Sequence, residues 1–252
     1  MHVLSPETKI IDKERINGLD VLKRIEKVGR VCYKSEDKIT EDGESAKKFV
    51  RMLIKNEHEA MIENTDNISV LFTVDRGVTH ELVRHRPASF AQESTRYCNY
   101  SQEKFGGDIN VINIKTGIET EGKIVDPLCI GEIVAEWTNA MQDAEKHYMR
   151  MLELGATPQI ARSVLPTSVK ADITVTANLR EWRHILKLRA VGTTGRPHPQ
   201  MVEIMVPLAK EFHELIPVVF DDIYEELVWL EENPDKTIKD YEVMKFKQAN
   251  NL

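Results

Sequence analysis

The sequence predicts a single mixed α/β (α+β) domain in which long helices flank a modest central sheet. Three observations predict this class. Apolar residues recur every three or four positions over residues 128–154 and 199–215, which is the period of amphipathic helices. Short β-branched runs at 68–74 and 171–176 are typical of strands. No repeat or low-complexity linker divides the chain, so we expect one domain over residues 1–252.

The first half of the chain carries local signals for short elements. The strand at 68–74 leads, at Gly77, into a short helix that Pro87 breaks, because proline removes a backbone donor. Glycine is frequent over residues 98–127, so mostly loops are expected there. The other elements expected in this half are a short strand within residues 1–12, helices at 19–31 and 42–57, and a short strand at 109–114.

The second half carries the longer helices. Residues 128–154 predict a major core helix, which Gly155 stops. Thr157 and Pro158 have the residue types that open a helix, and we expect a short one that carries Arg162. The remaining elements expected here are the strand at 171–176, a helix at 179–190, and a helix at 199–215 with a kink at Pro207.

Composition and charge limit the class of protein. Lys and Arg number 34 against 41 Asp and Glu, so the net charge is −7, and three cysteines at wide spacings do not form a disulfide framework. The amino-terminal residues lack a signal peptide's apolar segment, and no apolar run could span a bilayer, so we expect a cytoplasmic protein without membrane contact. The acidic balance disfavours a nucleic-acid-binding module, the alternative use of the arginine clusters described next.

Common ligand motifs are missing from the sequence. It contains no G-x-G-x-x-G, no P-loop and no G-x-S-x-G elbow, which disfavours a Rossmann nucleotide site and an α/β-hydrolase. His58-Glu59 and His80-Glu81 begin like a zinc-protease motif, but Ile62 and Arg84 stand where it needs its second histidine. We therefore expect no metal site.

Arginine is concentrated in two stretches. Residues 76–100 and 150–200 together hold ten arginines and two lysines, whereas the rest of the chain holds four arginines and 18 lysines. Arginine binds phosphate and carboxylate groups through two parallel hydrogen bonds. The clustering therefore indicates one site for an anionic ligand, and the alternative is a set of structural ion pairs.

Two segments carry this charge. Residues 84–97 place three arginines, His85 and two serines directly after a short helix, and a phosphate would neutralise them. The alternative is a capping box in which Ser89 and Gln92 begin a helix while the arginines form surface salt bridges. In the helix at 178–189, the helical period places Arg189 on the apolar face with Trp182 and Ile185, where an arginine needs an anionic partner. A salt bridge to a core carboxylate, or a side chain that reaches to the surface, is equally compatible with this position.

Four ordered motifs resemble the flavin-dependent thymidylate synthases. They cover roughly residues 58–200, and no motif assigns a role to residues 233–252. The departures from the family pattern are Ala60 in place of Ser or Thr, Asn64 in place of a histidine, and Glu81 in place of Gln. The motifs are RHR at 84–86 followed by Ser89 and by Ser94-x-Arg96, His58-Glu59 with Glu63, A-R-x-x-L-P at 161–166, and Asn178-x-Arg180 continuing to Arg189.

The resemblance implies a fold, a reaction and an assembly. The fold is that of the thymidylate synthase-complementing proteins, with one catalytic domain. In the reaction, dUMP receives a methylene group from 5,10-methylenetetrahydrofolate and a hydride from FADH⁻, and NADPH reduces the flavin. The assembly is a homotetramer with shared active sites.

The resemblance also implies the roles of particular residues. Arg189 is the catalytic residue that activates the uracil ring, a role that its position on the apolar face also suits. Ser94 is expected to bind rather than attack, and Cys98 is expected to be structural. The residues expected to bind dUMP are Glu81, Arg84, Gln92, Glu93, Ser94, Thr95, Arg96, Arg162 and Arg189. Those expected to bind FAD are His58, Ala60, Glu63, Arg84, His85, Arg86, Gln92, Asn178, Arg180 and His184.

Overall fold

The computed structural model describes residues 1–120 and 126–250, in which the chain forms two compact units. Unit one contains Met1–Lys9 and Val70–Val175, and unit two contains Ile10–Ser69 and Thr176–Leu252. Two strands, β3 (Ile68–Asp75) and β6 (Lys170–Ala177), pass from one unit into the other. The single domain over residues 1–252 therefore stays a prediction.

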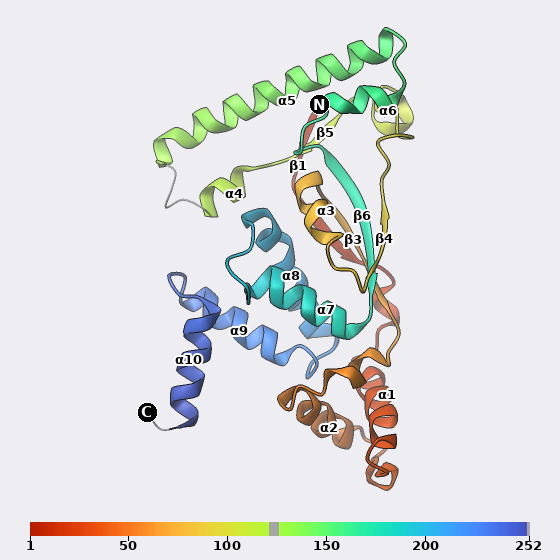
Figure 1. Cartoon of the computed structure of the whole chain (residues 1–252), viewed down its shortest axis with the longest axis vertical. Helices are drawn as coiled ribbons and strands as arrows, with labels where there is room; N and C mark the ends of the chain where they lie inside the picture. Colours follow the sequence, from red (N-terminus) through yellow and green to blue (C-terminus); the bar gives the residue numbers. More distant parts are fainter. Residues whose placement is uncertain (121–125, 251–252) are drawn as a thin grey trace. The chain divides into compact units, whose positions relative to one another are not determined.

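Figure 1 labels the α-helices and most of the strands. Strand β2 (Glu7–Ile10) lies at the division between the units, as β3 and β6 do. The other elements of unit one are β1 (His2–Leu4), α3 (Arg76–Leu82), β4 (Ser89–Gln92), η4 (Glu103–Phe105), β5 (Asn110–Ile112), α4 (Lys115–Thr120), η5 (Pro127–Cys129), α5 (Ile130–Glu153), α6 (Pro158–Ala161) and η6 (Arg162–Val164). Those of unit two are η1 (Lys13–Arg15), α1 (Gly18–Val31), η2 (Glu36–Lys38), α2 (Glu44–Lys55), η3 (Glu59–Glu63), α7 (Leu179–Leu186), η7 (Lys187–Val191), α8 (Pro199–Leu215), α9 (Asp221–Glu232) and α10 (Ile238–Ala249).

The strands form a two-stranded parallel sheet, β1-β5, and a four-stranded sheet in the order β2-β3-β6-β4. Alternate residues of β3 and β6 are buried, as the period of two along a strand requires. Side-chain hydrogen bonds of 2.7 Å join Ser69 to Thr176 and Thr73 to Asp172. The residue numbers rise on β3 as they fall on β6, which is the register of an antiparallel pair.

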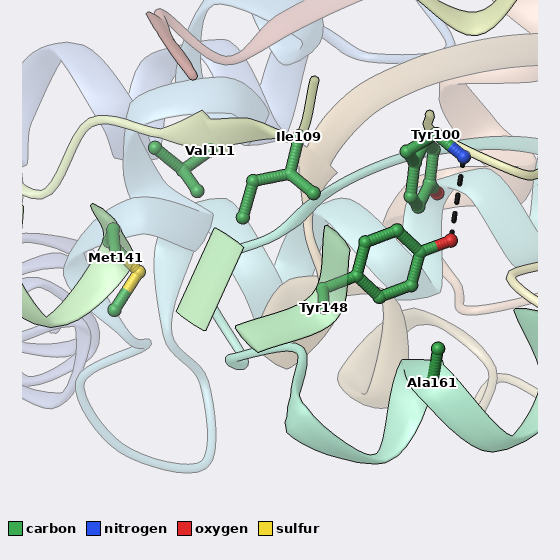
Figure 2. Close-up of a cluster of buried hydrophobic side chains, with 6 residues drawn as sticks. All are labelled: Tyr100, Ile109, Val111, Met141, Tyr148 and Ala161. Atoms are coloured by element: carbon green, nitrogen blue, oxygen red, sulfur yellow. Dashed lines mark hydrogen bonds between the residues drawn. The ribbon is translucent and has the colours of Figure 1, made fainter. Parts of the chain in front are cut away.

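A hydrophobic cluster in unit one packs α5 against the segments around β5 (Figure 2). The rings of Tyr100 and Tyr148 lie 5.9 Å apart, and the backbone N–H of Tyr100 donates to the Tyr148 hydroxyl at 3.4 Å. Their neighbours in the cluster are Ile109, Val111, Met141 and Ala161. The expectation of a major core helix is wrong in one respect, because only Met141 and Tyr148 of α5 are buried.

Unit two has an aromatic core between α7, α8 and the segment before α9. Trp182 and Phe212 lie 5.2 Å apart between ring centroids, and Phe212 and Phe220 lie 5.0 Å apart. The Trp182 indole N–H donates to the carbonyl of Ile68 at 2.9 Å, so its polar atom is satisfied inside the core. Helices α1 and α2 pack against each other in the same unit (Figure 1).

Most expected elements are confirmed within one to three residues at each end. The capping-box alternative is wrong, because Ser89–Gln92 form strand β4 rather than the start of a helix. The end of the helix at 179–190 also differs, since residues Lys187–Val191 form a π-helix. Helices α4, α9 and α10 and the second strand within residues 1–12 had no counterpart in the sequence prediction.

Among the described residues, none of the helices combines the length and the apolar character needed to cross a bilayer.

Candidate active site

In unit one, the RHR motif forms a turn between α3 and β4. Helix α3, which carries the half-buried Glu81, begins where the Asp75 carboxylate accepts from the backbone N–H of Val78 at 2.7 Å. Arg84 and Arg86 are exposed, whereas His85 is only 5% exposed. Within the described ranges, neither arginine forms a salt bridge, which removes the surface-salt-bridge alternative for both. Their charge is therefore available to an anion.

Strand β4 and the turn after it hold the Ser94-x-Arg96 motif. The Gln92 amide donates to the Thr79 hydroxyl of α3 at 3.0 Å, and the Glu93 backbone N–H donates to the Asp172 carbonyl at 2.8 Å. The Ser94 carbonyl then accepts from the backbone N–H of Cys98 at 2.9 Å, which closes the turn. The serine hydroxyl accepts from the Arg96 backbone N–H at 3.3 Å.

Two of the expected phosphate-binding motifs meet in this turn. The Arg162 guanidinium donates to the buried Thr95 hydroxyl at 3.3 Å, although 67 positions separate the two residues. Arg96 is exposed and packs over the Tyr97 ring at 5.4 Å. The structure therefore brings together Ser94, Thr95, Arg96 and Arg162, in an arrangement that suits a phosphate.

The Glu93 carboxylate is the centre of a polar network behind this turn. One oxygen accepts from the Tyr100 hydroxyl at 2.8 Å, and the other accepts from the Lys170 ammonium at 2.8 Å. Lys170 also donates to Asp172 at 2.7 Å. The ammonium is half buried, which lowers its pKa, but hydrogen bonds to Asp172 and Glu93 outweigh burial and raise the pKa overall. Glu93 thus links the turn to β6.

A cavity of about 430 Å³ lies beside this network, and Cys98 and Tyr100 are among the residues that line it. Burial shifts the pKa of both side chains. It raises the pKa of the Cys98 thiol, and the nearby Glu93 charge raises it further. The pKa of Tyr100 is raised by the same two causes. Both groups are therefore neutral near pH 7, which agrees with the expected structural role of Cys98.

In unit two, the His58-Glu59 and Asn178-x-Arg180 motifs face each other. Asn178 begins α7, because its side-chain oxygen accepts from the Glu181 backbone N–H at 2.9 Å. Two residues later, the Arg180 guanidinium forms an ion pair with Glu63 in η3. These two residues, both expected to bind FAD, therefore bind each other in this structure.

Two of the departures from the family pattern, Ala60 and Asn64, lie within η3 and directly after it. Exposed Ala60 has polar groups only in its backbone, and its carbonyl accepts from the Asn64 amide at 3.4 Å. His58 forms a hydrogen bond of 3.2 Å between its Nδ1 and the Tyr33 hydroxyl. Any hydrogen bond that Ala60 makes with a ligand must come from its backbone atoms.

Arg189 lies in the π-helical segment η7 that follows α7. Its side chain is half buried, whereas Trp182, Ile185 and Leu186 of α7 are completely buried. A π-helix has more residues per turn than an α-helix, so the angles between successive residues of η7 differ from those assumed by the α-helical period. The expected place of Arg189 on the apolar face stays a prediction, and its side chain is less buried than those of Trp182 and Ile185. Such π-helical turns occur frequently at functional sites. His184 is exposed on α7.

A family model described as "Thymidylate synthase complementing protein" matches residues 16–218. The chain belongs to this family. The match confirms the resemblance that the four motifs indicate, and it favours an enzyme over the nucleic-acid-binding alternative.

Curated relatives carry the name flavin-dependent thymidylate synthase. The protein of Corynebacterium aurimucosum is 28% identical over 207 residues, which are 79% of each chain. That of Corynebacterium glutamicum is 27% identical over 225 residues, or 82% of this chain and 80% of the relative.

Solved structures extend the likeness to the fold. The UMP/dUMP methylase PolB from Streptomyces cacaoi, bound with 5-Br dUMP, matches with a TM-score of 0.71 and 24% identity over 88% of this chain and 96% of that one. This match confirms the expected mixed fold of the thymidylate synthase-complementing family.

Three polar residues of this family member were not predicted from the motifs. Lys170 and Tyr100 bind Glu93, and the fully buried Arg183 binds Glu59. A signal for Arg183 exists in the sequence, because Leu179 and Leu186 lie one helical turn before and after it and place it on a buried face. No local pattern indicates Lys170 or Tyr100.

Proposed function

We propose that this chain synthesises dTMP from dUMP by reductive methylation, with the methylene group from 5,10-methylenetetrahydrofolate and the hydride from reduced FAD that NADPH regenerates. The observation that carries the proposal is the family match over residues 16–218, with all four motifs inside it. Relatives that share about four-fifths of the chain are named for this flavin-dependent activity.

The residues present fit a flavin dinucleotide. FAD carries a diphosphate, and Arg84 and Arg86 offer it two exposed guanidiniums that no described carboxylate neutralises. In unit two, Arg180 pairs with Glu63 on the surface, where an ion pair is weak enough to exchange for a phosphate. When bound, FAD would supply the hydride. The residues that we propose to hold it are His58, Ala60, Glu63, Arg84, His85, Arg86, Gln92, Asn178, Arg180 and His184.

The chain's own chemistry is charge stabilisation at the uracil ring. C5 becomes nucleophilic when negative charge on the N3–C4–O4 edge is stabilised, and a guanidinium against that edge does so. We assign this role to Arg189, whose half-buried position excludes part of the surrounding water and so strengthens the interaction. Glu81 can accept a hydrogen bond from a pyrimidine N–H but, when ionised, cannot donate one.

The dUMP phosphate is assigned to the turn in unit one. Arg96 and Arg162 supply charge, and Ser94 and Thr95 supply hydroxyl and backbone groups. Arg84, Gln92 and Glu93 complete the proposed substrate set. Because the Glu93 carboxylate already binds Tyr100 and Lys170, we propose that Glu93 acts by fixing the turn.

We also propose the homotetramer with shared active sites. Size-exclusion chromatography with light scattering tests it, and an active monomer would contradict it.

One experiment tests the function directly. The purified protein should be yellow with bound flavin, its absorption should change when dUMP is added, and it should form dTMP with methylenetetrahydrofolate and NADPH. A colourless protein that takes up no FAD and forms no dTMP would overturn the proposal.

Replacement of Ser94 by alanine should leave measurable dTMP formation. The serine hydroxyl accepts a backbone hydrogen bond and has no described base beside it, so it is a weak nucleophile. We expect a loss of about tenfold in kcat/KM, the value of one lost hydrogen bond. Complete loss of turnover with dUMP still bound would assign the attack to Ser94.

Replacement of Lys170 by methionine should raise the KM for dUMP by about tenfold, with a smaller change in kcat. Without the ammonium, Glu93 and Asp172 repel each other and the turn at 93–98 loses its link to β6. Steady-state kinetics measure the effect, and replacement of the exposed Lys146 of α5 by methionine is the control. An unchanged KM in K170M would show that the network does not position the substrate.

A further inference from the structure

Arg183 is a buried cation that the proposed chemistry does not use. Its side chain is 1% exposed, although it lies in α7 between Arg180 and His184, which both reach the surface. Removal of a guanidinium from water carries a large free-energy cost unless its donors are all satisfied. A position of this kind therefore needs a compensating set of acceptors.

The acceptors account for all five N–H donors of the guanidinium. Nε and Nη2 donate to one oxygen of Glu59 at 3.1 and 2.8 Å. Nη1 and Nη2 donate to the two oxygens of Asp222 at 2.7 and 2.9 Å. Nη1 also donates to the Val219 carbonyl. Arg183 thus joins three segments of unit two: η3, the loop before α9, and the first turn of α9.

The loop before α9 is strained where it meets Arg183. Val218 has a φ of +77°, a left-handed conformation that costs a β-branched residue free energy. Its backbone N–H donates to Asp221 at 2.7 Å, and the next carbonyl, of Val219, accepts from Arg183. The carbonyl that follows this strained residue thus accepts the fifth hydrogen bond of the guanidinium.

The two carboxylates, Glu59 and Asp222, belong to different segments and differ in their other partners. Glu59 lies in η3 between His58 and Ala60, so it belongs to the segment proposed to bind flavin. Asp222 lies in α9, away from the sequence motifs, and also binds Lys187 at 3.0 Å. The side chains of Glu59 and Asp222 are exposed to similar extents, 27% and 31%.

A second link joins the same two motifs at the surface. Arg180 and Glu63 form an ion pair with side chains 49% and 45% exposed, and solvent screens such a pair. Solvent screens the buried link from Arg183 to Glu59 less, so of these two ion pairs it holds η3 against α7 more strongly. With η3 fixed in this way, Arg180 can leave Glu63 for an anionic ligand without loss of the segment's position.

We propose that Arg183 is a positioning residue that holds the 58–63 segment in its flavin-binding conformation through Glu59. The inference rests on the proposed function, because the proposed reaction requires the flavin that this segment would bind. Asp222 and Val219 accept the remaining hydrogen bonds of the guanidinium and hold it in place. Glu59, bound to the same guanidinium, then holds the 58–63 segment.

The test compares two matched variants of the full-length protein. A substitution of Arg183 itself would leave two carboxylates unpaired and could prevent folding. E59Q and D222N each remove one carboxylate charge from Arg183 and should lower the melting temperature to similar extents. E59Q should weaken FAD binding about tenfold, measured by flavin fluorescence on titration of the apoprotein, whereas D222N should stay within about twofold. Equal effects of the two variants on FAD binding, or no effect of E59Q, would overturn the proposal.

Hydrogen exchange separates this inference from the proposed function. E59Q should speed amide exchange over residues 59–64, and D222N should speed it over 218–224, whether or not FAD is present. If the wild-type protein binds no FAD, the proposed function fails, and the exchange pattern still decides whether Arg183 positions the segment. Unchanged exchange over 59–64 in E59Q would contradict the positioning role.

Discussion

Replacement of Arg189 by alanine is expected to slow dTMP formation severely while the protein keeps its flavin. The guanidinium is proposed to stabilise charge that develops on the uracil ring, and removal of such a group costs about 10²- to 10³-fold in rate. Flavin contacts are proposed for other residues, so the absorption of bound FAD should remain. Anaerobic single-turnover assays of dTMP, together with the visible spectrum, measure both effects.

Two control variants sharpen this prediction. R189K keeps the charge but loses the planar pair of donors, so its rate should lie between those of the wild type and R189A. R196A removes an exposed arginine outside the proposed site and should leave the rate unchanged. Full activity in R189A would remove charge stabilisation by this residue from the mechanism.

Replacement of Glu226 by glutamine is expected to stabilise the protein at neutral and alkaline pH, but not at acidic pH. Burial raises the pKa of Glu226 to about 7 from 4.5, with Asp222 contributing and Lys187 opposing. One of its carboxylate oxygens is buried without a hydrogen-bond partner among the described residues. Ionisation of this group in the folded state is therefore unfavourable.

The sign of the pH effect follows from this shift. Between pH 4.5 and about 7, the folded protein binds more protons at Glu226 than the unfolded chain does, so stability falls as pH rises through that window. The full shift corresponds to about 3 kcal/mol, and partial contact of the carboxyl group with water reduces the expected gain in E226Q to about 2 kcal/mol near pH 8.

Urea unfolding of E226Q and wild type at about pH 5 and pH 8 measures the difference. E225Q, at the exposed neighbouring position, is the matched control and should follow the wild type at both pH values. A constant gap between E226Q and wild type across the pH range would show that Glu226 does not titrate in this window.

The sequence located most of the regular elements, because helix and strand periods are properties of neighbouring residues. The apolar face at three- and four-residue spacing predicted α1, α2, α5 and α8, and the β-branched runs predicted β3 and β6. The exposure of α5 was not predictable in this way. The apolar period identifies which face of a helix is buried, but not how much of its length finds a partner.

For the candidate site, too, one part could be predicted from the sequence and another part could not. The four motifs, and with them the family, could be identified from the sequence, because each motif is a local run of residue types. The structure added that Arg162 binds Thr95, that Arg180 binds Glu63, and that Ser89 and Gln92 lie in a strand. It also placed Arg189 in a π-helical segment, where the angle between successive residues differs from that of an α-helix.

The sequence by itself therefore determined the elements, the arginine-rich motifs and the family. Only the tertiary structure decided which charges are buried and what they bind. Arg183 and Glu59 are 124 positions apart, and Lys170 and Glu93 are 77 apart. The free energy of such pairs depends on burial and on the geometry of donors and acceptors, which arise when distant segments pack together.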